Sequence, residues 1–528
     1  MTKGYISIIL HSHMPFIRHP NLKDPLEERW LFEGISECYI PLIEVYDKLI
    51  KDHMDFKITM SITPTLMTML EDEYLNKRYL KYLKKSIALS KKEINRTKYN
   101  KELAVLAKFY NERLSKILDI YRNYDYNIMN AFRKFDKLGY LEVLTSAATH
   151  GLLPLLAINP ESVKAQIGVG VQCYLEYMGH PPHGIWLPEC AYTHSLDPVL
   201  KEYGIDYFIS ENKAIINASP KSRYGVYAPI SLPNGISVFG RDIESSYQVW
   251  SDFKGYPGDF DYREFYRDIG YELPLEYIEP YINEDKVRID TGIKYYRITG
   301  NTDNKEYYNR KIAMERIKEH GEHFFKCRVE QIDKFSRHMD QPPIIVCPYD
   351  TELFGHWWFE GPDFIDEFIR KTMQNNCNYK LISPRDYLKK YPIVQCSSPC
   401  SSSWGENGDF SVWINPSNQW IYRKIHKCGK QMVRLSNTYK NPTDLQRRTL
   451  NQAARELMLA ESSDWPFIIK NHTAVEYAVK RINNHVDRFN KLYDSITKDA
   501  IDLKYLSQLE KLDNIFKSID YKIYQDSK

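Results

Sequence analysis

The sequence lacks the features that mark several broad classes of protein. No stretch approaches roughly 18 consecutive apolar residues, so we expect no membrane-spanning helix. The N-terminus has no basic segment followed by an apolar segment and a small-residue cleavage site, so we expect no secretory signal. The nine cysteines form no Cys-x-x-Cys pair, and the spacing from Cys396 to Cys400 has no matching pair to complete a zinc site. This pattern indicates reduced thiols in a cytoplasmic protein.

An excess of charge of one sign is also missing. The chain has 72 Lys plus Arg against 69 Asp plus Glu, a formal net charge of +3 over 528 residues. No global basic field is available to hold a polyanion, so we expect no nucleic-acid partner. Aromatic residues are abundant instead, at 14% with 41 Tyr and 9 Trp. Flat amphipathic rings suit stacking on sugars, although Tyr also fills ordinary surfaces and cores.

Short apolar runs rich in β-branched residues recur along the chain, and turn or helix signals follow each of them. We expect strands at 5–10, 57–63, 141–147, 184–187, 207–210, 236–240, 344–348 and 379–382. Several runs are almost continuously apolar, which is typical of a parallel sheet buried on both faces. The segments between them have helical spacing. About seven βα units favour a barrel over an open sheet.

Two regions depart from this alternation. Residues 70–137 are dense in Lys, Glu, Asn and Tyr with apolar residues at helical spacing, which predicts an amphipathic helical insertion. After Pro399 a Ser/Gly/Trp loop runs to about Trp420, and helical patterns without strand signals fill the remainder. We therefore expect two domains. The first is a barrel at 1–395 with an insertion at about 70–137, and the second is a helical domain at 396–528.

The first candidate site residues are His11 and His13, which come directly after the first predicted strand. They alternate by two, so both side chains point to the same side, at the barrel end where active sites form. Three interpretations stay open from these residues alone: a satisfied structural pair, two ligands of a metallohydrolase, or polar contacts to sugar hydroxyls.

Two carboxylates follow apolar strands in the same way. Glu189 lies in Gly-Ile-Trp-Leu-Pro-Glu, and Asp350 follows Ile-Ile-Val-Cys-Pro-Tyr. A carboxylate in such surroundings costs several kcal/mol unless it is paired or protonated, so a buried salt bridge is the simple alternative to a catalytic role. Two carboxylates facing each other across a barrel mouth match glycosidic chemistry, which needs one to attack the anomeric carbon and one to protonate the leaving oxygen.

Other residues fit an oligosaccharide groove. His150 follows the strand at 141–147, which is another position at the barrel mouth. Trp404, Trp413 and Trp420 lie in or beside a polar loop rich in Gly and Ser, where an indole is more often exposed than buried. For each Trp alone a core position is about as good an interpretation. The cluster is the better signal.

Five ordered motifs together resemble a known family. They are His11-Ser-His-Met-Pro, His150-Gly-Leu-Leu-Pro, Gly184-Ile-Trp-Leu-Pro-Glu-Cys-Ala-Tyr, Tyr349-Asp-Thr-Glu-Leu-Phe-Gly-His-Trp-Trp and Ser462-Ser-Asp-Trp-Pro-Phe. The chain resembles glycoside hydrolase family 57 from about residue 5 to about residue 480, and within it the 1,4-α-glucan branching enzymes most. The resemblance implies an incomplete (β/α)7 barrel, an inserted helical domain, a C-terminal helical domain lining the groove, and retention of configuration. It also implies α-glucan substrates (amylose, amylopectin or glycogen), no metal and no cofactor.

Carried onto matching positions, the resemblance makes Glu189 the nucleophile and Asp350 the general acid/base. It assigns His11, His13 and His150 to the donor-glucose subsite, which decides the His-x-His question against a metal. The further substrate contacts that it implies are Trp30, Trp186, Arg263, Arg267, Tyr271, His356, Trp404, Trp413 and Asp464.

Some positions depart from the family pattern. Tyr271 stands where some relatives have Trp, and Thr473 stands where a Gln often contacts substrate. The stretch 224–240 lies where branching enzymes carry a lid loop with a Tyr, for which Tyr224 and Tyr227 are candidates. These differences leave the two-carboxylate chemistry intact, but they affect whether the enzyme transfers the glucan chain or hydrolyses it.

We therefore predict a retaining 1,4-α-glucan branching enzyme. A 4-α-glucanotransferase or α-amylase with the same catalytic residues is the first alternative. A metal-dependent deacetylase-like barrel that uses His11 and His13 is a second, and a glucan-binding protein without catalysis is a third. The presence of both carboxylates argues against the last.

Overall fold

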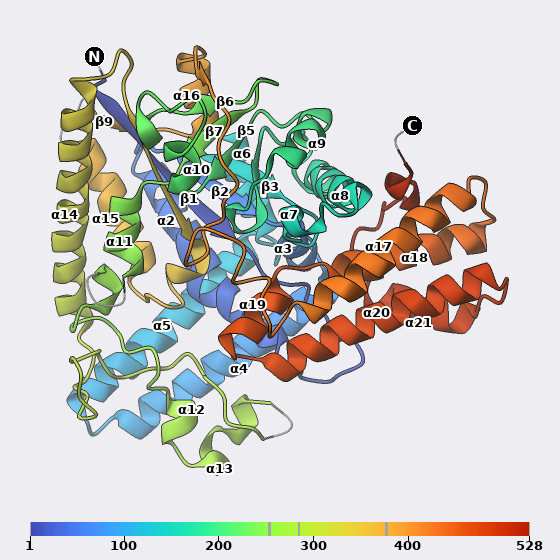
Figure 1. Ribbon diagram of the computed structural model, residues 1–528. Coiled ribbons are helices and arrows are strands. Elements are labelled where there is room, and N and C mark those ends of the chain that lie inside the picture. Colours follow the sequence, from blue (N-terminus) through green and yellow to red (C-terminus); the bar gives the residue numbers. More distant parts are fainter. Residues whose placement is uncertain (1, 252–254, 284–285, 375–378, 527–528) are drawn as a thin grey trace.

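The structure is a computed structural model that describes residues 2–251, 255–283, 286–374 and 379–526. Its centre is a curled sheet in which seven strands run parallel in the order β8-β1-β2-β3-β4-β5-β7 (Figure 1). The strands are β1 (Gly4–Ser12), β2 (Ile58–Ile62), β3 (Leu141–Ser146), β4 (Gly184–Trp186), β5 (Tyr207–Ser210), β7 (Ser237–Gly240) and β8 (Ile344–Asp350). The two end strands approach each other without forming a ladder among the described residues, although the amide of Asp242, just past β7, donates to Val346 O on β8 at 2.9 Å. The predicted incomplete (β/α)7 barrel is confirmed.

All eight strands expected from the apolar runs form, including β9 (Tyr379–Leu381), which pairs with the start of β1. Two further strands, β6 (Ile230–Ser231) and β10 (Gln395–Cys396), were not predicted. Each has only two residues, which is too short for a hydrophobic pattern to register.

Alternation along β1 explains how the barrel is filled. All nine residues of β1 are buried, and its side chains point by turns to the helices outside and to the barrel interior. Tyr5 and Ile9 belong to an interior cluster that also contains Trp186, Tyr207 and Val346. His11 continues the phase of Tyr5 and Ile9, so the sequence periodicity carries its imidazole to the interior above this apolar layer.

The barrel helices surround the sheet. They are α1 (Glu28–Gly34), α2 (Ile40–Lys51), α3 (Pro64–Leu70), α7 (Leu153–Leu156), α8 (Pro160–Met178), α9 (Asp197–Glu202), α10 (Asn212–Ile216), α14 (Arg310–Ser336), α15 (Gly361–Gln374) and α16 (Pro384–Lys390). In Figure 1, α14 and α15 lie on one side of the sheet and α8 and α9 on the other.

The predicted insertion forms α4 (Glu73–Thr97), α5 (Lys101–Asn123) and α6 (Met129–Lys137). The side chains of Asp72 and Asn100 cap α4 and α5. A second insertion, which the sequence did not predict, lies between β7 and α14. Its described residues form α11 (Ile243–Trp250), α12 (Ile269–Glu272), α13 (Leu275–Ile278), two short 3-10 helices and long loops. Its elements are too short for a helical period to be read. It packs on the predicted insertion, where Tyr295 donates to Glu93 at 2.9 Å.

The C-terminal segment is helical, as predicted. It consists of α17 (Trp420–Thr438), α18 (Asp444–Ala460), α19 (Asp464–Asn471), α20 (Val475–Thr497) and α21 (Leu503–Leu512). These helices lie beside the barrel, drawn orange to red in Figure 1. The boundary at residue 396 stays a prediction. Of the helices that the structure describes, none is long and apolar enough to cross a membrane.

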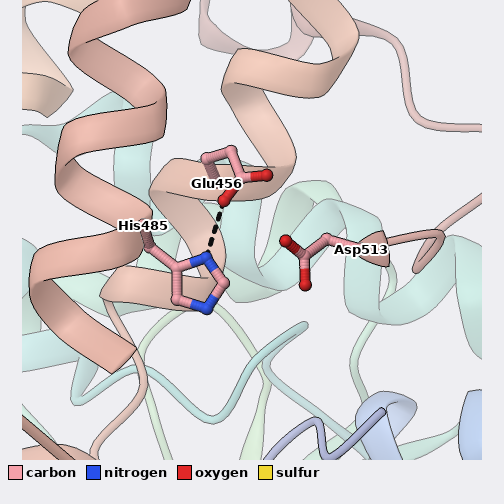
Figure 2. A group of neighbouring side chains, drawn as sticks. All are labelled: Glu456, His485 and Asp513. Atoms are coloured by element: carbon pink, nitrogen blue, oxygen red, sulfur yellow. Dashed lines mark hydrogen bonds and ion pairs between the residues drawn. The ribbon is translucent and has the colours of Figure 1, made fainter. Parts of the chain in front are cut away.

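A buried polar cluster joins three of these helices (Figure 2). His485 on α20 donates from Nδ1 to Glu456 on α18 at 2.6 Å, and Arg488 on α20 donates to Asp513 at the end of α21, also at 2.6 Å. Glu456, His485 and Asp513 carry ligand atoms within 4.8 Å of one another. However, Arg488 and the buried Arg481 already compensate the two carboxylates. A divalent cation would add uncompensated charge, so we interpret the cluster as structural.

We expect Glu456→Gln to lower the free energy of unfolding of these helices by roughly 3 kcal/mol, because it leaves a buried cation without part of its compensation. The measurement is the urea midpoint followed by circular dichroism. The matched control is Glu510→Gln, which breaks a half-exposed bidentate pair with Arg448 between α18 and α21 and should cost less than about 1 kcal/mol. Equal midpoint shifts for the two variants would contradict the assignment.

Candidate active site

The end of β1 places His11 between two neighbouring strands. In the parallel register His11 lies opposite Asp350 on β8 and opposite Ser61 on β2. Side chains at paired positions of a parallel sheet share a face. The first predicted histidine and the predicted acid/base residue therefore meet at the open end of the barrel.

Glu189 follows β4 in a tight turn after Pro188. Its backbone is left-handed, with φ 61° and ψ 23°, a conformation that costs a non-glycine residue of order 1–3 kcal/mol and is typical of functional sites. The side chain is held at both oxygens. Trp404 Nε1 donates to Oε2 at 2.8 Å, and Ser463 Oγ donates to Oε1 at 2.9 Å.

The two predicted catalytic carboxyls differ in their surroundings. Burial, followed by the negative charges of Glu352 and Glu189, raises the pKa of Asp350 well above its usual value. Burial also raises the pKa of Glu189, but there the hydrogen bonds from Trp404 and Ser463 act in the opposite direction. This difference favours a proton on Asp350 and a charge on Glu189, which is the division that an acid and a nucleophile require.

Three imidazoles form a stack beside these carboxyls. The ring centroids of His13 and His150 are 3.8 Å apart, and those of His11 and His150 are 5.1 Å apart. His13 Nε2 lies 3.0 Å from both oxygens of Asp464. Burial opposes a charge on His13, but Asp464, together with the charges of Glu189 and Glu352, raises the pKa of His13 above its usual value. Burial lowers the pKa of His11 and of His150 well below its usual value, so the stack carries its positive charge on His13.

These side chains open into a cavity of about 1120 Å³. Eight of the predicted site residues line it, and they are His11, His13, His150, Glu189, Arg263, Asp350, Trp404 and Asp464. Arg263 is almost fully buried, with its guanidinium 4.0 Å from the Phe359 ring centroid. The cavity is large enough for several sugar units and opens to solvent at the barrel mouth.

Two tryptophans predicted to contact substrate are buried and do not line the cavity. Trp186 is fully buried beneath His11, with ring centroids 4.4 Å apart, because the alternation along β4 points its side chain into the apolar interior layer. Trp413 is 1% exposed, since its loop folds back and packs the indole against Leu152 and Ala191. Each of the two indoles packs beneath side chains that line the cavity.

Four further predicted contacts also lie off the cavity wall. Trp30 packs edge-on to Tyr477 at 5.7 Å, and His356 bonds to Glu37 at 2.6 Å behind the wall. Arg267 and Tyr271 belong to the second insertion, where Arg267 pairs with Glu272 and Tyr271 is 51% exposed. The remaining corrections concern the expected lid stretch 224–240.

Neither tyrosine of that stretch reaches the cavity. Tyr227 stacks on Phe335 of α14 with ring centroids 3.6 Å apart, and the Tyr224 hydroxyl lies near the backbone of Asp340 on the outer side. A lid role for either residue is not supported by this position, because the stretch is tied into β6 and β7.

The structure adds residues that the sequence did not single out. They are Glu352, Ser463, Arg241, Trp357 and Phe467, and all but Ser463 line the cavity. Trp357 is 55% exposed and stacks on Phe265 with centroids 4.4 Å apart, which leaves one face for a ligand. Glu352 and Trp357 lie inside the quoted motif around Asp350, so their proximity was available in the sequence.

We expect Glu352→Gln to move the basic limb of the kcat/KM profile to lower pH. Glu352 accepts a 2.5 Å hydrogen bond from Tyr39, and burial raises its own pKa to about 7. Its negative charge raises the pKa of Asp350, so the neutral amide lets Asp350 lose its proton at lower pH. The profile is measured on a soluble maltooligosaccharide. Glu264→Gln is the control, because that cavity carboxylate pairs with Lys305 at 3.2 Å and is not among the charges that act on Asp350; an equal shift there would contradict the assignment.

The geometry of the described residues bears on the metal-dependent alternative that uses His11 and His13. Apart from the cluster around Glu456, no three His, Cys, Asp or Glu side chains in the described ranges bring ligand atoms within 4.8 Å of one another. His11 and His150 use their ring nitrogens on each other and on hydroxyl groups. The histidines are therefore arranged as hydrogen-bonding groups.

Family models match most of the chain. A model described as glycosyl hydrolase family 57 matches residues 7–339, and one described as the C-terminal part of 1,4-α-glucan branching enzymes matches residues 424–524. The second match covers α18 to α21 and Ser463 and Asp464 with them. The first match covers most of β1 and all of β2 to β7 with His11, His150 and Glu189, but ends before Asp350.

Similar proteins cover the whole length. A 1,4-α-glucan branching enzyme of Thermococcus kodakarensis is 33% identical over 98% of this chain and 78% of its own. Among solved structures, an α-amylase of Thermotoga maritima has a TM-score of 0.93 at 44% identity, covering 99% of both chains. A branching enzyme of Pyrococcus horikoshii has a TM-score of 0.89 at 34% identity, covering 100% of this chain and 97% of its own.

Proposed function

The chain belongs to glycosyl hydrolase family 57, and from that premise we propose that it is a 1,4-α-glucan branching enzyme. One observation carries the proposal. The segment that matches the C-terminal part of branching enzymes supplies Asp464 to the cavity wall and Ser463 to the predicted nucleophile. The relatives of Thermococcus and Pyrococcus that bear this name support it across the full length.

In the proposed first step, Glu189 attacks the anomeric carbon of an α-1,4-linked glucosyl unit, and the bond from that carbon to the leaving oxygen breaks. Asp350 gives its proton to the leaving oxygen. The raised pKa of Asp350 and the two hydrogen bonds on Glu189 support these roles. The product is a covalent glucosyl ester with inverted configuration.

In the second step, a 6-hydroxyl of a glucan chain attacks the same carbon and gives its proton to Asp350. The ester bond to Glu189 breaks, and the second inversion restores the α configuration as an α-1,6 branch. Water in place of the 6-hydroxyl yields hydrolysis by the same residues. Features that exclude water and bind a second chain decide the outcome, and Trp357 and Phe467, both partly exposed at the cavity, are suited to that task.

A second candidate is an α-amylase, favoured by the 44% identity to the Thermotoga maritima enzyme of that name. Both candidates share the catalytic residues and differ in the acceptor. A cytoplasmic location and the absence of nucleic-acid and membrane partners stay predictions from the sequence.

The deciding experiment incubates the purified protein with amylose and follows two signals together. Proton NMR reports new α-1,6 linkages, and a reducing-end assay reports hydrolysis. We expect α-1,6 signal with few reducing ends. Reducing ends without branches would overturn the branching proposal in favour of the amylase.

A further inference from the structure

We propose that Ser463 is a positioning residue whose hydroxyl is held as a hydrogen-bond donor to Glu189 by a relay through His150. The inference rests on the proposed role of Glu189 and adds to it a group from the helical segment. The relay consists of four side chains in the order Ser61, His11, His150 and Ser463. Its last member, Ser463, donates to Glu189.

The contact depends on how the helical segment docks on the barrel. The amide of Ser463 donates to His150 O at 3.0 Å, and Gly151 forms a β-bridge with Ser462. Thr149 donates to Met458 O on α18. The loop after β3 and the turn before α19 are thus held together by backbone contacts on both sides of the hydroxyl, so the position of Ser463 is fixed independently of Glu189.

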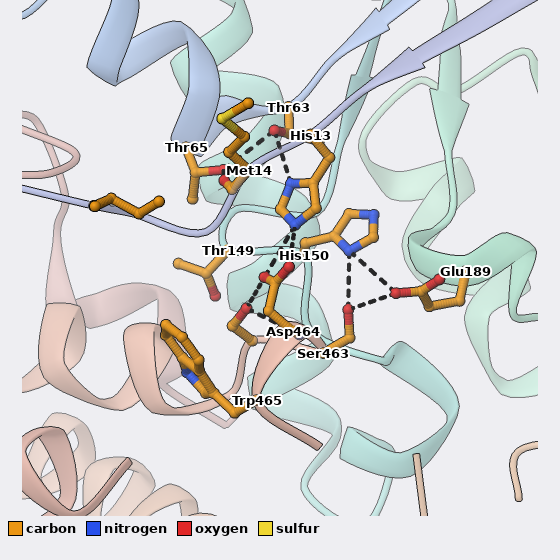
Figure 3. Close-up of polar contacts among 12 residues, drawn as sticks. His13, Met14, Thr63, Thr65, Thr149, His150, Glu189, Ser463, Asp464 and Trp465 are labelled. Atoms are coloured by element: carbon orange, nitrogen blue, oxygen red, sulfur yellow. Dashed lines mark hydrogen bonds and ion pairs between the residues drawn. The ribbon is translucent and has the colours of Figure 1, made fainter. Parts of the chain in front are cut away.

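Figure 3 shows the hydroxyl between two partners. Ser463 Oγ lies 2.9 Å from Glu189 Oε1 and 2.9 Å from His150 Nδ1. An ionised carboxylate only accepts, so the single hydroxyl proton points to Glu189. The hydroxyl oxygen must then accept from His150, which places a proton on His150 Nδ1.

The same reasoning continues through the next imidazole. A neutral His150 with its proton on Nδ1 has an accepting Nε2, which lies 3.1 Å from His11 Nε2. His11 must therefore carry its proton on Nε2 and accept at Nδ1. Ser61 Oγ, 3.1 Å from that nitrogen, can supply the proton for this last bond. Every donor in the relay then has one acceptor, and no hydrogen bond has a proton on both of its atoms.

His13 keeps the relay neutral. Its ring stacks on His150, but its Nε2 faces Asp464 at 3.0 Å and its Nδ1 faces Thr63. The charge on His13 disfavours a second charge on His11 or His150, adding to the effect of their burial. His13 thus carries the positive charge of the stack, and the neutral imidazoles of His11 and His150 orient the hydroxyl groups of the relay.

The direction of the relay is tied to the charge of the nucleophile. If Glu189 were protonated at Oε1 and donated to Ser463, every bond would reverse, and both imidazoles would exchange the nitrogen that carries the proton. The forward direction is favoured because the hydrogen bond from Ser463 to an ionised Glu189 is charge-assisted and therefore stronger than the bond in the reversed relay. After the glucosyl ester forms, the free ester oxygen can still accept from Ser463.

The test measures the pH profile of kcat/KM for total cleavage of α-1,4 links, so it works for a branching enzyme and an amylase alike. Ser463→Ala should lower kcat by roughly 10- to 100-fold with little change in KM, because a hydrogen bond to a charged group is lost. The acidic limb should move to higher pH, since the lost bond favoured the ionised form. Ser463→Thr, which keeps the hydroxyl, should restore both. An unmoved acidic limb in Ser463→Ala overturns the proposal.

A second pair of variants tests the far end of the relay. Ser61→Ala removes a hydroxyl that does not line the cavity and should move the same limb in the same direction by a smaller amount. Ser146→Ala is the matched control: that buried serine ends β3 and donates to Trp186 O at 2.8 Å, outside the relay. Equal profiles for the two variants overturn the relay.

The other ionisable groups facing Glu189 stay unaltered in these variants, and they are His13, His150, Asp350, Asp464, Arg241 and Tyr422. A measurement without variants completes the test. Nitrogen-15 spectra of histidine in the unmodified protein should show the Nδ1–H tautomer for His150 and the Nε2–H tautomer for His11, and the reverse assignment overturns the proposal. Full activity of Glu189→Gln would instead refute the proposed function itself.

Discussion

Glu189→Gln is expected to abolish both cleavage and transfer, with kcat lowered by at least roughly 10⁴-fold. The amide cannot form the glucosyl ester. Its oxygen can still accept from Trp404, whereas its NH2 group faces Ser463 as a donor, so that hydrogen bond reverses direction. The measurement is the initial rate of α-1,4 cleavage in amylose, with new α-1,6 linkages followed in parallel. Both signals should vanish together, because one covalent intermediate precedes both outcomes.

A matched substitution separates chemistry from folding. Glu461 is buried two residues from Ser463 and accepts a 2.9 Å hydrogen bond from Gln166, but it does not line the cavity. Glu461→Gln should keep cleavage within a few-fold of the unmodified protein. Normal turnover in Glu189→Gln with an intact fold would refute the role of Glu189.

The stereochemistry of a rescued reaction identifies the nucleophile. In Glu189→Ala, azide can occupy the space of the missing carboxylate and attack the anomeric carbon of an activated α-glucosyl donor. We expect a β-glucosyl azide, because a single displacement inverts the configuration. An α-glucosyl azide from this variant would assign the nucleophile to another residue.

The barrel was predictable because its physics is local. A strand buried on both faces must be almost continuously apolar, so the runs that became β1, β5 and β8 were visible in the sequence. The same rule placed His11 and Asp350 at one edge of the sheet, since parallel strands end together. The parts of the fold that were not predicted are short or irregular, such as the segment between β7 and α14 that contains α12 and α13.

The features of the site that the sequence did not predict depend on long-range packing. Trp413 was predicted as a substrate contact, with a core position about as good an interpretation, and the loop folds back and buries the indole under Gly405. Ser463 looked like an ordinary residue before a helix, yet it lies 274 residues from Glu189 in sequence and bonds to it. No local pattern encodes which hydroxyl a docked helix will deliver to a carboxylate.

Asp350→Ala should lower the rate on amylose by roughly 10²- to 10⁴-fold, because the leaving sugar oxygen needs a proton and Asp350 is proposed to give it. A maltosyl fluoride leaves without a proton, so formation of the glucosyl ester from that donor should be nearly normal in the variant. Comparing the two substrates therefore separates the acid role of Asp350 from its contribution to binding. An equal loss on both would contradict the acid role.

The second step should then be limiting in Asp350→Ala, since no base is left to activate the acceptor hydroxyl. Azide needs no base, so it should raise turnover of maltosyl fluoride and give an α-linked azide by double displacement, opposite to the product expected from Glu189→Ala. The basic limb of the pH profile should disappear as well, because the group whose raised pKa sets it is gone. A β-linked azide from Asp350→Ala would show instead that Asp350 is the nucleophile and Glu189 the acid/base. If the two variants give opposite anomers of the azide, the product identifies Glu189 as the nucleophile and Asp350 as the acid/base.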